Sequence, residues 1–370
     1  MIYFDNAATS FPKPRSVIDS VMDCIENYCG NPSRSSHPLS MMAAEAVFSA
    51  RCAVADLVSA ENPESVVFTE NATYALNMAI KTALPEKCHV ITSDIEHNSV
   101  IRPLERMRFT KDIEYSLFNS DKDIYEAIPP LIQSNTKAIV CTLMSNVTGK
   151  TIDLAALSEI ARRYSLILIV DASQMIGHGK IELSKTPCDI LCAPGHKALF
   201  GIQGCGFAVF KDTAVKETFI EGGSGNNSIS PNMPGLLPEH FEAGTLPTPS
   251  IVSLKAGIDF INGYGMENVT EKLRALEERT LEILSSVSGI KAYGNGPVSF
   301  SYKDVPSSYV CGALNKVGIY TRCGLHCAPS AHKKIGSLKT GLTRISLSVF
   351  NTKEELDKLY ISLKDITKTL

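Results

Sequence analysis

Leu-Ile-Leu-Ile-Val-Asp, residues Leu166–Asp171, is the stretch that decides the fold class of this 370-residue chain. An unbroken apolar run that ends in a carboxylate is typical of a parallel strand buried on both faces. Similar short runs occur at Val66–Phe68, Val90–Thr92, Ala138–Cys141 and Asp189–Cys192, each followed by turn residues or a helix start. This alternation predicts βαβ units and therefore an α/β fold with a mainly parallel sheet.

Lys197 ends the turn Ala193–Lys197, Ala-Pro-Gly-His-Lys, directly after one of these predicted strands. A lysine held at the mouth of a strand among apolar neighbours can lose its proton and attack a carbonyl carbon. For the motif alone, a solvated lysine on a surface loop is the alternative. Asp171 favours the first interpretation, because it lies at the carboxyl end of another predicted strand. Open α/β sheets bind their ligands in the crevice at these strand ends.

Asp171 and Gln174 are the partners that a pyridoxal phosphate (PLP) site requires beside such a lysine. An aspartate keeps the pyridine nitrogen of PLP protonated, so that the ring can accept electrons from a substrate carbanion. The amide of Gln174 can donate a hydrogen bond to the ring oxygen. Asp171 by itself would also fit a helix N-cap. Together with Lys197, it predicts PLP as the cofactor.

Seven motifs follow one another along the chain in a fixed order. They are Tyr3–Ala8 (Tyr-Phe-Asp-Asn-Ala-Ala), Glu96–His97, Ser145–Gly149 (Ser-Asn-Val-Thr-Gly), Val170–Gln174 (Val-Asp-Ala-Ser-Gln), Gly195–Lys197, Phe241–Thr245 (Phe-Glu-Ala-Gly-Thr) and Arg322–Ala328 (Arg-Cys-Gly-Leu-His-Cys-Ala). With these motifs the chain resembles a class V aminotransferase of the cysteine desulfurase and selenocysteine lyase family. The resemblance continues into Asn351–Asp357 and so covers nearly the whole chain.

The resemblance implies fold type I of the PLP-dependent transferases, with a mainly parallel sheet in a large domain and a smaller α+β C-terminal domain. We place the large PLP-binding domain at residues 14–245, and the small domain at residues 246–370 together with residues 1–13. The glycine- and proline-rich stretch Gly222–Gly244 predicts a long loop. Helices are expected at Ser250–Asn262, at Met266–Ser286 and from about Lys353.

The cofactor-binding residues come from local patterns and from the resemblance. Ala72 and Thr73 begin a predicted helix after a strand, where free backbone N–H groups bind phosphate well, although an ordinary N-cap is the alternative. His196 is a further candidate donor to the phosphate. By resemblance, His97 stacks on the pyridine ring and assists proton transfer, and Thr245 of a second subunit donates to the phosphate. The expected set is Ala72, Thr73, His97, Asn146, Asp171, Gln174, His196, Lys197 and Thr245.

Arg344 is the expected binding residue for the carboxylate of an α-amino acid substrate. It lies in the alternating stretch Gly341–Leu347, and a guanidinium can bind a carboxylate through two parallel hydrogen bonds. A solvated arginine at a strand edge is the alternative. In the family, the arginine at this position holds the carboxylate with the help of an asparagine, which is Asn146 in this chain.

Cys327 is the expected second reactive centre. Glycine and proline imply a defined loop at Arg322–Pro329, and positive potential from Arg322 and His326 would favour a thiolate. A thiolate near PLP can attack the substrate sulfur and keep it as a persulfide, and the short loop resembles the group II desulfurases and selenocysteine lyases. We therefore expect catalytic roles for Lys197, Cys327 and His97, and substrate binding by Asn146, Arg322, Arg344 and His326.

Three positions depart from the family pattern. Pro194 replaces a serine of many relatives and offers neither a hydroxyl nor an N–H to a phosphate. Leu325 replaces a second histidine of many group II members, and Cys323 replaces a threonine and is a candidate for a resolving thiol. The competing interpretation of this loop is a zinc site made by Cys323, His326, Cys327 and His332, but the histidine spacing matches no recognised pattern, so no metal is expected.

The composition agrees with a compact enzyme. A net charge of −3 and a pI of about 6.3 give no electrostatic reason for binding nucleic acid or an anionic membrane. No apolar run approaches the ~18 residues of a membrane span, and the first residues do not resemble a signal peptide, so we expect a cytoplasmic location. Eleven cysteines without a regular framework fit a reducing compartment.

The predicted function is conversion of L-cysteine to L-alanine with a persulfide on Cys327, and the family resemblance adds L-selenocysteine as a substrate. The expected partners are a second copy of the chain and a sulfur-acceptor protein. One alternative keeps PLP and makes the chain an aminotransferase, epimerase or β-lyase in which Cys327 takes no part. Another is a non-catalytic α/β ligand-binding protein or a zinc module.

Overall fold

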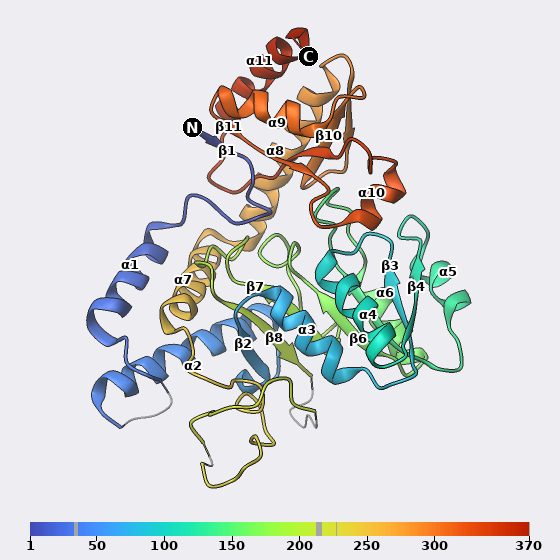
Figure 1. Cartoon of the computed structure of the whole chain (residues 1–370). Coiled ribbons are helices and arrows are strands. Elements are labelled where there is room, and N and C mark those ends of the chain that lie inside the picture. Colours follow the sequence, from blue (N-terminus) through green and yellow to red (C-terminus); the bar gives the residue numbers. More distant parts are fainter. Residues whose placement is uncertain (33–35, 212–216, 227, 370) are drawn as a thin grey trace.

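The protein is described by a computed structural model that covers residues 1–32, 36–211, 217–226 and 228–369. Figure 1 shows a large lobe built around a central sheet and a smaller lobe that contains both termini. The long helix α7 (Thr248–Tyr264) runs beside α1 (Arg15–Asp23) and α2 (Pro38–Val58) and leads from the large lobe toward the smaller one.

A seven-stranded sheet forms the centre of the large lobe, in the order β2-β8-β7-β6-β5-β3-β4. Strands β7, β6, β5, β3 and β4 pair in parallel, whereas β8 runs antiparallel to both of its neighbours. The strands are β2 (Val66–Thr69), β3 (His89–Ser93), β4 (Glu114–Phe118), β5 (Thr136–Thr142), β6 (Ile167–Asp171), β7 (Ile190–Pro194) and β8 (Gly206–Phe210). The predicted α/β class and the mainly parallel sheet are confirmed.

Helices cover both faces of this sheet, which explains why its strands are apolar throughout. In β6, Leu168 and Val170 pack into one hydrophobic cluster and Ile169 packs into the other, and each side chain is at most 1% exposed. The helices of the large lobe are α1 (Arg15–Asp23), α2 (Pro38–Val58), α3 (Ala72–Ala83), α4 (Asn98–Thr110), α5 (Ile124–Ala127) and α6 (Leu154–Arg163). Burial on both faces fixes the directions of the strand ends that carry the site.

The smaller lobe contains a four-stranded antiparallel sheet in the order β12-β13-β10-β9. Its elements are α8 (Met266–Ser285), β9 (Ile290–Tyr293), β10 (Val298–Tyr302), α9 (Ser307–Lys316), β11 (Ile319–Tyr320), β12 (Arg322–Gly324), α10 (Pro329–Ile335), β13 (Leu342–Ile345) and α11 (Lys353–Thr369). The N-terminal strand β1 (Ile2–Tyr3) pairs with β11 of this lobe.

Two strands of the seven-stranded sheet lie outside the predicted set. The sequence patterns that we used did not predict β4 or β8. The division at residue 245 stays a prediction, but the packing of α7 against α1 and α2 favours a boundary near Gly265. The described residues of Gly222–Gly244 form neither a helix nor a strand, in agreement with the predicted loop. Within the described residues, no helix has the length and apolar character needed to cross a membrane.

Candidate active site

A cavity of about 170 Å³ lies at the carboxyl ends of β5, β6 and β7. It brings together all of the expected cofactor-binding residues except Thr245. Its walls are formed by Asn71, Ala72, Thr73, His97, Ser99, Thr142, Met144, Asn146, Asp171, Ser173, Gln174, Pro194, His196 and Lys197. The crevice at the parallel strand ends is therefore the place where these distant motifs meet.

Lys197 enters this cavity from the turn that follows β7. The turn is held by hydrogen bonds from the N–H of Gly195 to the carbonyl of Cys205 (2.9 Å) and from the N–H of Phe200 to the carbonyl of Lys197 (3.0 Å). Burial lowers the pKa of Lys197 to about 8, against an opposing effect of the Asp171 carboxylate. About one-tenth of the amine is then neutral at pH 7, far more than for a solvated lysine.

Lys13 stabilises the same turn. The sequence patterns did not predict this role. Its ammonium donates hydrogen bonds to the carbonyls of Gly201 (2.7 Å) and His196 (3.1 Å) and to the hydroxyl of Ser10 (2.7 Å). The N–H of Ser10 and the hydroxyl of Thr9 also donate to the His196 carbonyl, each at 3.1 Å. The N-terminal segment thus fixes the backbone next to Lys197.

Asp171 is 3% exposed at the end of β6, and its Oδ1 accepts a hydrogen bond from the N–H of Ser173 (2.9 Å). A turn follows it and no helix begins there, so Asp171 is not the N-cap that the sequence left open. Gln174 is also buried, and its amide donates to the carbonyl of Ala7 (3.1 Å). A carboxylate and an amide are therefore both held at the cavity wall.

The start of α3 forms another wall of the cavity. Asn71 caps this helix, since its side chain accepts a hydrogen bond from the N–H of Tyr74 (3.0 Å). The N–H groups of Ala72 and Thr73 belong to the first turn, whose amides have no partner within the helix. The hydroxyls of Thr73 and Ser99 lie 2.8 Å apart, within hydrogen-bond distance of each other, and both residues line the cavity. Such a helix start is suited to an anion.

His97 caps α4 and lines the cavity. Its Nδ1 accepts a hydrogen bond from the N–H of Ser99 (3.1 Å), and burial lowers its pKa to about 4. The imidazole is therefore neutral at pH 7, with the proton on Nε2. The neighbouring Glu96 is fully buried and accepts from the N–H of Thr142 (3.0 Å), which ties the end of β3 to β5 and fixes His97. Burial raises the pKa of Glu96 to about 8.

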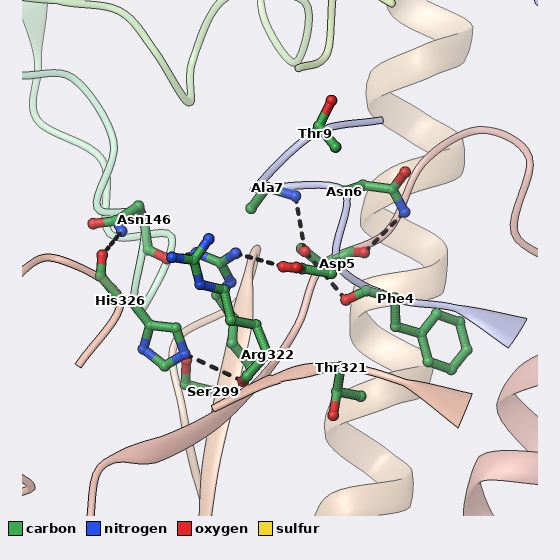
Figure 2. A network of polar contacts seen from close by, with 12 residues as sticks. Phe4, Asp5, Asn6, Ala7, Thr9, Asn146, Ser299, Thr321, Arg322 and His326 are labelled. Atoms are coloured by element: carbon green, nitrogen blue, oxygen red, sulfur yellow. Dashed lines mark hydrogen bonds and ion pairs between the residues drawn. The ribbon is translucent and has the colours of Figure 1, made fainter. Parts of the chain in front are cut away.

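Arg344 lies in β13 and is 1% exposed. Its guanidinium donates hydrogen bonds to the carbonyl of Asn146 (3.0 Å) and to Oδ1 of Asp5 (2.8 Å), and Figure 2 shows Asp5 and Asn146 on this network. The buried Nε of Arg344 has no hydrogen-bond partner among the described residues. A buried guanidinium with an unused donor is what an anionic ligand requires.

Arg322 stands directly opposite Arg344 in the antiparallel pair β12–β13. Cross-strand partners point to the same face of a sheet, and two like charges placed in this way repel each other. Burial lowers the pKa of Arg344. The charge of Arg322 lowers this pKa further, whereas the carboxylate of Asp5 raises it. Asp5 forms its salt bridge with Arg344, so the charge of Arg322 leaves an excess of positive charge for a bound anion.

Cys327 lies in a recess of about 360 Å³ next to the cavity, and both spaces are lined by Thr73, His97 and Ser99. The loop that carries the cysteine is held from two sides, by hydrogen bonds from the N–H of Asn98 to the Cys327 carbonyl (2.7 Å) and from the Asn146 amide to the His326 carbonyl (2.6 Å). Positive φ angles at His326 (51°) and Cys327 (56°) show that these contacts impose a strained backbone.

His326 does not supply the positive potential that we expected from the sequence. The ring is 4% exposed and lies between the carbonyl of Arg322 (3.3 Å) and Nε2 of His332 (3.2 Å). Burial and the charge of Arg344 lower the pKa of His326 to about 3, so the imidazole is neutral at pH 7. The cations that share the recess with Cys327 come instead from the helices, as Lys81, Arg102 and Arg106.

Cys323 lies near Cys311 and adds to the rise that burial causes in the pKa of the Cys311 thiol. Its role as a resolving thiol stays a prediction. Among the residues that the structure describes, no group of three or more histidine, cysteine, aspartate or glutamate side chains is arranged to hold a metal ion. The four residues of the zinc alternative therefore do not converge.

The cavity fits a ligand with an aldehyde, a basic ring nitrogen and a phosphate. Lys197 offers an amine of lowered pKa, and Asp171 offers a buried carboxylate. The start of α3 offers amides and a hydroxyl. Nδ1 of His196 is buried at the cavity without a hydrogen-bond partner in the described part of the chain. These are the groups that would hold PLP.

Thr245 lies outside this cavity, and its hydroxyl accepts a hydrogen bond from the side chain of Asn31 (3.3 Å). It does not cap the following helix α7, whose N-cap is Pro247. The preceding Glu242 is anchored by Arg51, with two hydrogen bonds of 2.9 and 2.8 Å between their buried side chains. This ion pair fixes the segment that carries Thr245.

Known proteins resemble this chain along nearly its whole length. The profile of the family described as Aminotransferase class-V matches residues 2–359. A protein of Borreliella burgdorferi named "Probable cysteine desulfurase" is 30% identical, over 100% of this chain and 92% of the relative. A "Cysteine desulfurase" of Haloferax volcanii is 29% identical over 97% of this chain and 88% of the relative. The solved apo structure of the cysteine desulfurase from Thermococcus onnurineus NA1 has a TM-score of 0.90, 27% identity and coverage of 100% and 95% of the two chains.

Proposed function

The chain belongs to the class-V aminotransferase family, and from this premise we propose that it is a PLP-dependent cysteine desulfurase. In this proposal it converts L-cysteine, and also L-selenocysteine, to L-alanine. The sulfur stays on Cys327 as a persulfide and passes to an acceptor protein in the cytoplasm. One observation carries the proposal: the cavity with Lys197 and Asp171 shares a wall with the recess that contains Cys327.

Lys197 and Asp171 would act on two different protons, one on the substrate α-carbon and one on the ring nitrogen of PLP. When bound, PLP supplies a ring that accepts electrons from the substrate α-carbon. Asp171 would hold the proton on the ring nitrogen, because its buried carboxylate favours a nearby positive charge. Lys197, whose pKa of about 8 lies close to neutral pH, takes the proton from the α-carbon. Neutral His97 contributes Nε2–H as a donor at the cavity wall.

Arg344 and Cys327 act on the two ends of the substrate. Arg344 binds the carboxylate through its unused Nε and one terminal nitrogen, while Asp5 and Asn146 hold the guanidinium in place. The thiolate of Cys327 attacks the substrate sulfur and the bond between carbon and sulfur breaks. The carbon keeps the electron pair and takes up a proton, so that cysteine and the enzyme thiol yield alanine and the enzyme persulfide.

Product analysis tests the proposed reaction. The protein with PLP is incubated with L-cysteine and a reductant, and alanine, sulfide, pyruvate and keto acids are quantified. Equal amounts of alanine and sulfide support desulfuration. Pyruvate with sulfide would instead indicate a β-lyase, and a keto acid without sulfide would indicate an aminotransferase.

Replacing Asp171 by asparagine is expected to reduce turnover about a hundredfold while part of the PLP binding remains. An amide of the same shape cannot hold the proton on the ring nitrogen by charge. Alanine release and PLP absorbance are measured in parallel on the variant and on Asp153→Asn, which changes an exposed cap of α6. Near-normal turnover of Asp171→Asn would contradict the assigned role.

Replacing Arg344 by lysine is expected to raise the KM for L-cysteine about 30-fold, which corresponds to about 2 kcal/mol for a lost charge-assisted hydrogen bond. Lysine keeps the charge but lacks the planar fork that binds a carboxylate through two nitrogens. Arg274→Lys serves as the control, because that side chain is 74% exposed. The melting temperatures of the two variants are measured as well. If they agree, an equal KM for Arg344→Lys and Arg274→Lys would exclude Arg344 from carboxylate binding.

A homodimer with shared active sites completes the proposal. Thr245 lies outside the cavity of its own subunit, which suits a residue that reaches the PLP phosphate of a partner. Large apolar side chains are also exposed on α1 and α2, including Met41 (61%) and Phe48 (52%). Exposed apolar surface of this kind is typical of an interface between subunits.

Mixing two variants that each lose one proposed contribution to the site tests this arrangement. Hybrid dimers of one Lys197→Ala and one Thr245→Ala subunit are expected to have up to about half of the activity of the unchanged dimer. The reason is that one of their two sites carries neither defect. Sedimentation should show a dimer. An active monomer, or hybrids without any recovered activity, would contradict the shared site.

A further inference from the structure

The recess beside Cys327 is walled by two helices. Thr73, Asn77 and Lys81 follow one another at four-residue spacing along α3, and Arg102 and Arg106 are spaced in the same way on α4. Residues four apart lie on the same face of a helix. The recess is therefore a groove between the two faces, and Cys327 lies on it together with His97.

The charged side chains that line this groove are all positive. Its lining contains Lys81, Arg102 and Arg106 and no carboxylate. Both arginines are exposed, and neither forms a salt bridge with any described residue, whereas Arg108 on the same helix pairs with Glu105 (3.2 Å). Like charges four residues apart weaken a helix, so the repulsion between Arg102 and Arg106 has a small cost for α4. Grouped cations in a concave site attract an anionic partner.

We propose that this groove docks an acidic segment of the sulfur acceptor, with the acceptor thiol placed against Cys327. The inference rests on the proposed function and adds the chemistry of the partner. Along α3 the groove extends from Thr73 to Lys81, roughly 12 Å at 1.5 Å per residue, which is about the length of three or four extended residues. This length favours a peptide segment with several carboxylates over a single small thiol.

The transfer step is balanced without any further oxidant or reductant. The acceptor thiolate attacks the outer sulfur of the Cys327 persulfide, and the bond between the two sulfurs breaks. Cys327 leaves as a thiolate and takes up the proton that the acceptor thiol lost. The acceptor becomes the persulfide. Lys81, Arg102 and Arg106 touch neither L-cysteine nor PLP in this step, and they only attract and orient the acceptor.

The charge preference of the groove can be measured without turnover. The Cys327 thiol is modified by dithiobis-nitrobenzoate, which carries two carboxylates, or by uncharged dithiodipyridine, and the label is followed by mass spectrometry. Relative to the exposed Cys29, Cys327 is expected to prefer the dianion about tenfold at low salt, with a much smaller preference at high salt. The double variant Arg102→Gln/Arg106→Gln should lose most of this preference, whereas Arg108→Gln should keep it. Equal preferences in all three proteins would overturn the proposal.

The second arm uses a peptide with one cysteine between aspartates and its counterpart with asparagines. After L-cysteine has loaded sulfur onto Cys327, transfer to the acidic peptide should be about tenfold faster, and the double variant should lose this advantage. Equal rates for the two peptides, or equally fast transfer to mercaptosuccinate, would overturn docking of an acidic segment. Failure to load sulfur would contradict the proposed function, and the disulfide reagents would still decide the charge preference of the groove.

Discussion

Replacing Lys197 by alanine is expected to lower alanine formation from L-cysteine about a thousandfold or more, because the variant has no amine to move the α-proton. The structure gives the reason in the lowered pKa of about 8, which makes this amine reactive near neutral pH. Alanine release is measured with saturating PLP. Borohydride reduction of the unchanged protein, followed by peptide mapping, should place the pyridoxyl label on Lys197.

Lys13 is the strictest control for the label on Lys197, because burial also lowers the pKa of this neighbouring lysine to about 8. Its ammonium is engaged by two carbonyls and a hydroxyl, so we expect Lys13→Met to lower stability and to leave the label on Lys197. Lys185→Ala, which changes a 70% exposed side chain, should behave as the unchanged protein. A label on Lys13 instead of Lys197 would refute the assignment.

Replacing Cys327 by alanine is expected to reduce desulfuration of L-cysteine about a hundredfold, since the variant has no thiolate to take the sulfur. Binding of L-cysteine should remain, because the residues around Arg344 are unchanged. Cleavage of L-selenocysteine should fall much less, as a selenolate leaves more readily. Absorbance changes on adding L-cysteine, alanine release and selenide release are the three measurements.

Cys29 provides the matched control for this variant. It is an exposed thiol far along the chain from the recess, and Cys29→Ser should keep full activity. Desulfuration of L-cysteine by Cys327→Ala at the control rate would leave the β-lyase or aminotransferase alternative and remove the persulfide from the mechanism.

Residues at the ends of buried strands were the most predictable part of the site. Asp171 and Lys197 follow apolar runs of the parallel sheet, and these runs can be recognised because both faces of the sheet are covered. The edge strand β4 was missed because it is no continuous apolar run: Phe118 at its end is buried, and its other residues are exposed or half-buried. The strand β8 is a fully buried apolar run, Gly-Phe-Ala-Val-Phe, which the same criterion could have identified.

Interactions between distant segments were beyond the reach of the sequence. Asp5 and Arg344 are 339 positions apart, and only the folded chain brings the carboxylate to the guanidinium. The same holds for the opposite placement of Arg322 and Arg344, which depends on the register of β12 and β13. The charge of His326 was predicted incorrectly, because its type and spacing suggest a cation while its burial makes the ring neutral.

The central claim is that sulfur from L-cysteine is retained on Cys327. The most direct measurement is mass spectrometry of the PLP-loaded protein after a single turnover with L-cysteine in the absence of reductant. We expect the mass of one added sulfur atom on the peptide that contains Cys327, released by a reductant, together with one alanine per site. Alanine formed in this amount without added sulfur on Cys327, or with the sulfur on another cysteine, would contradict the claim.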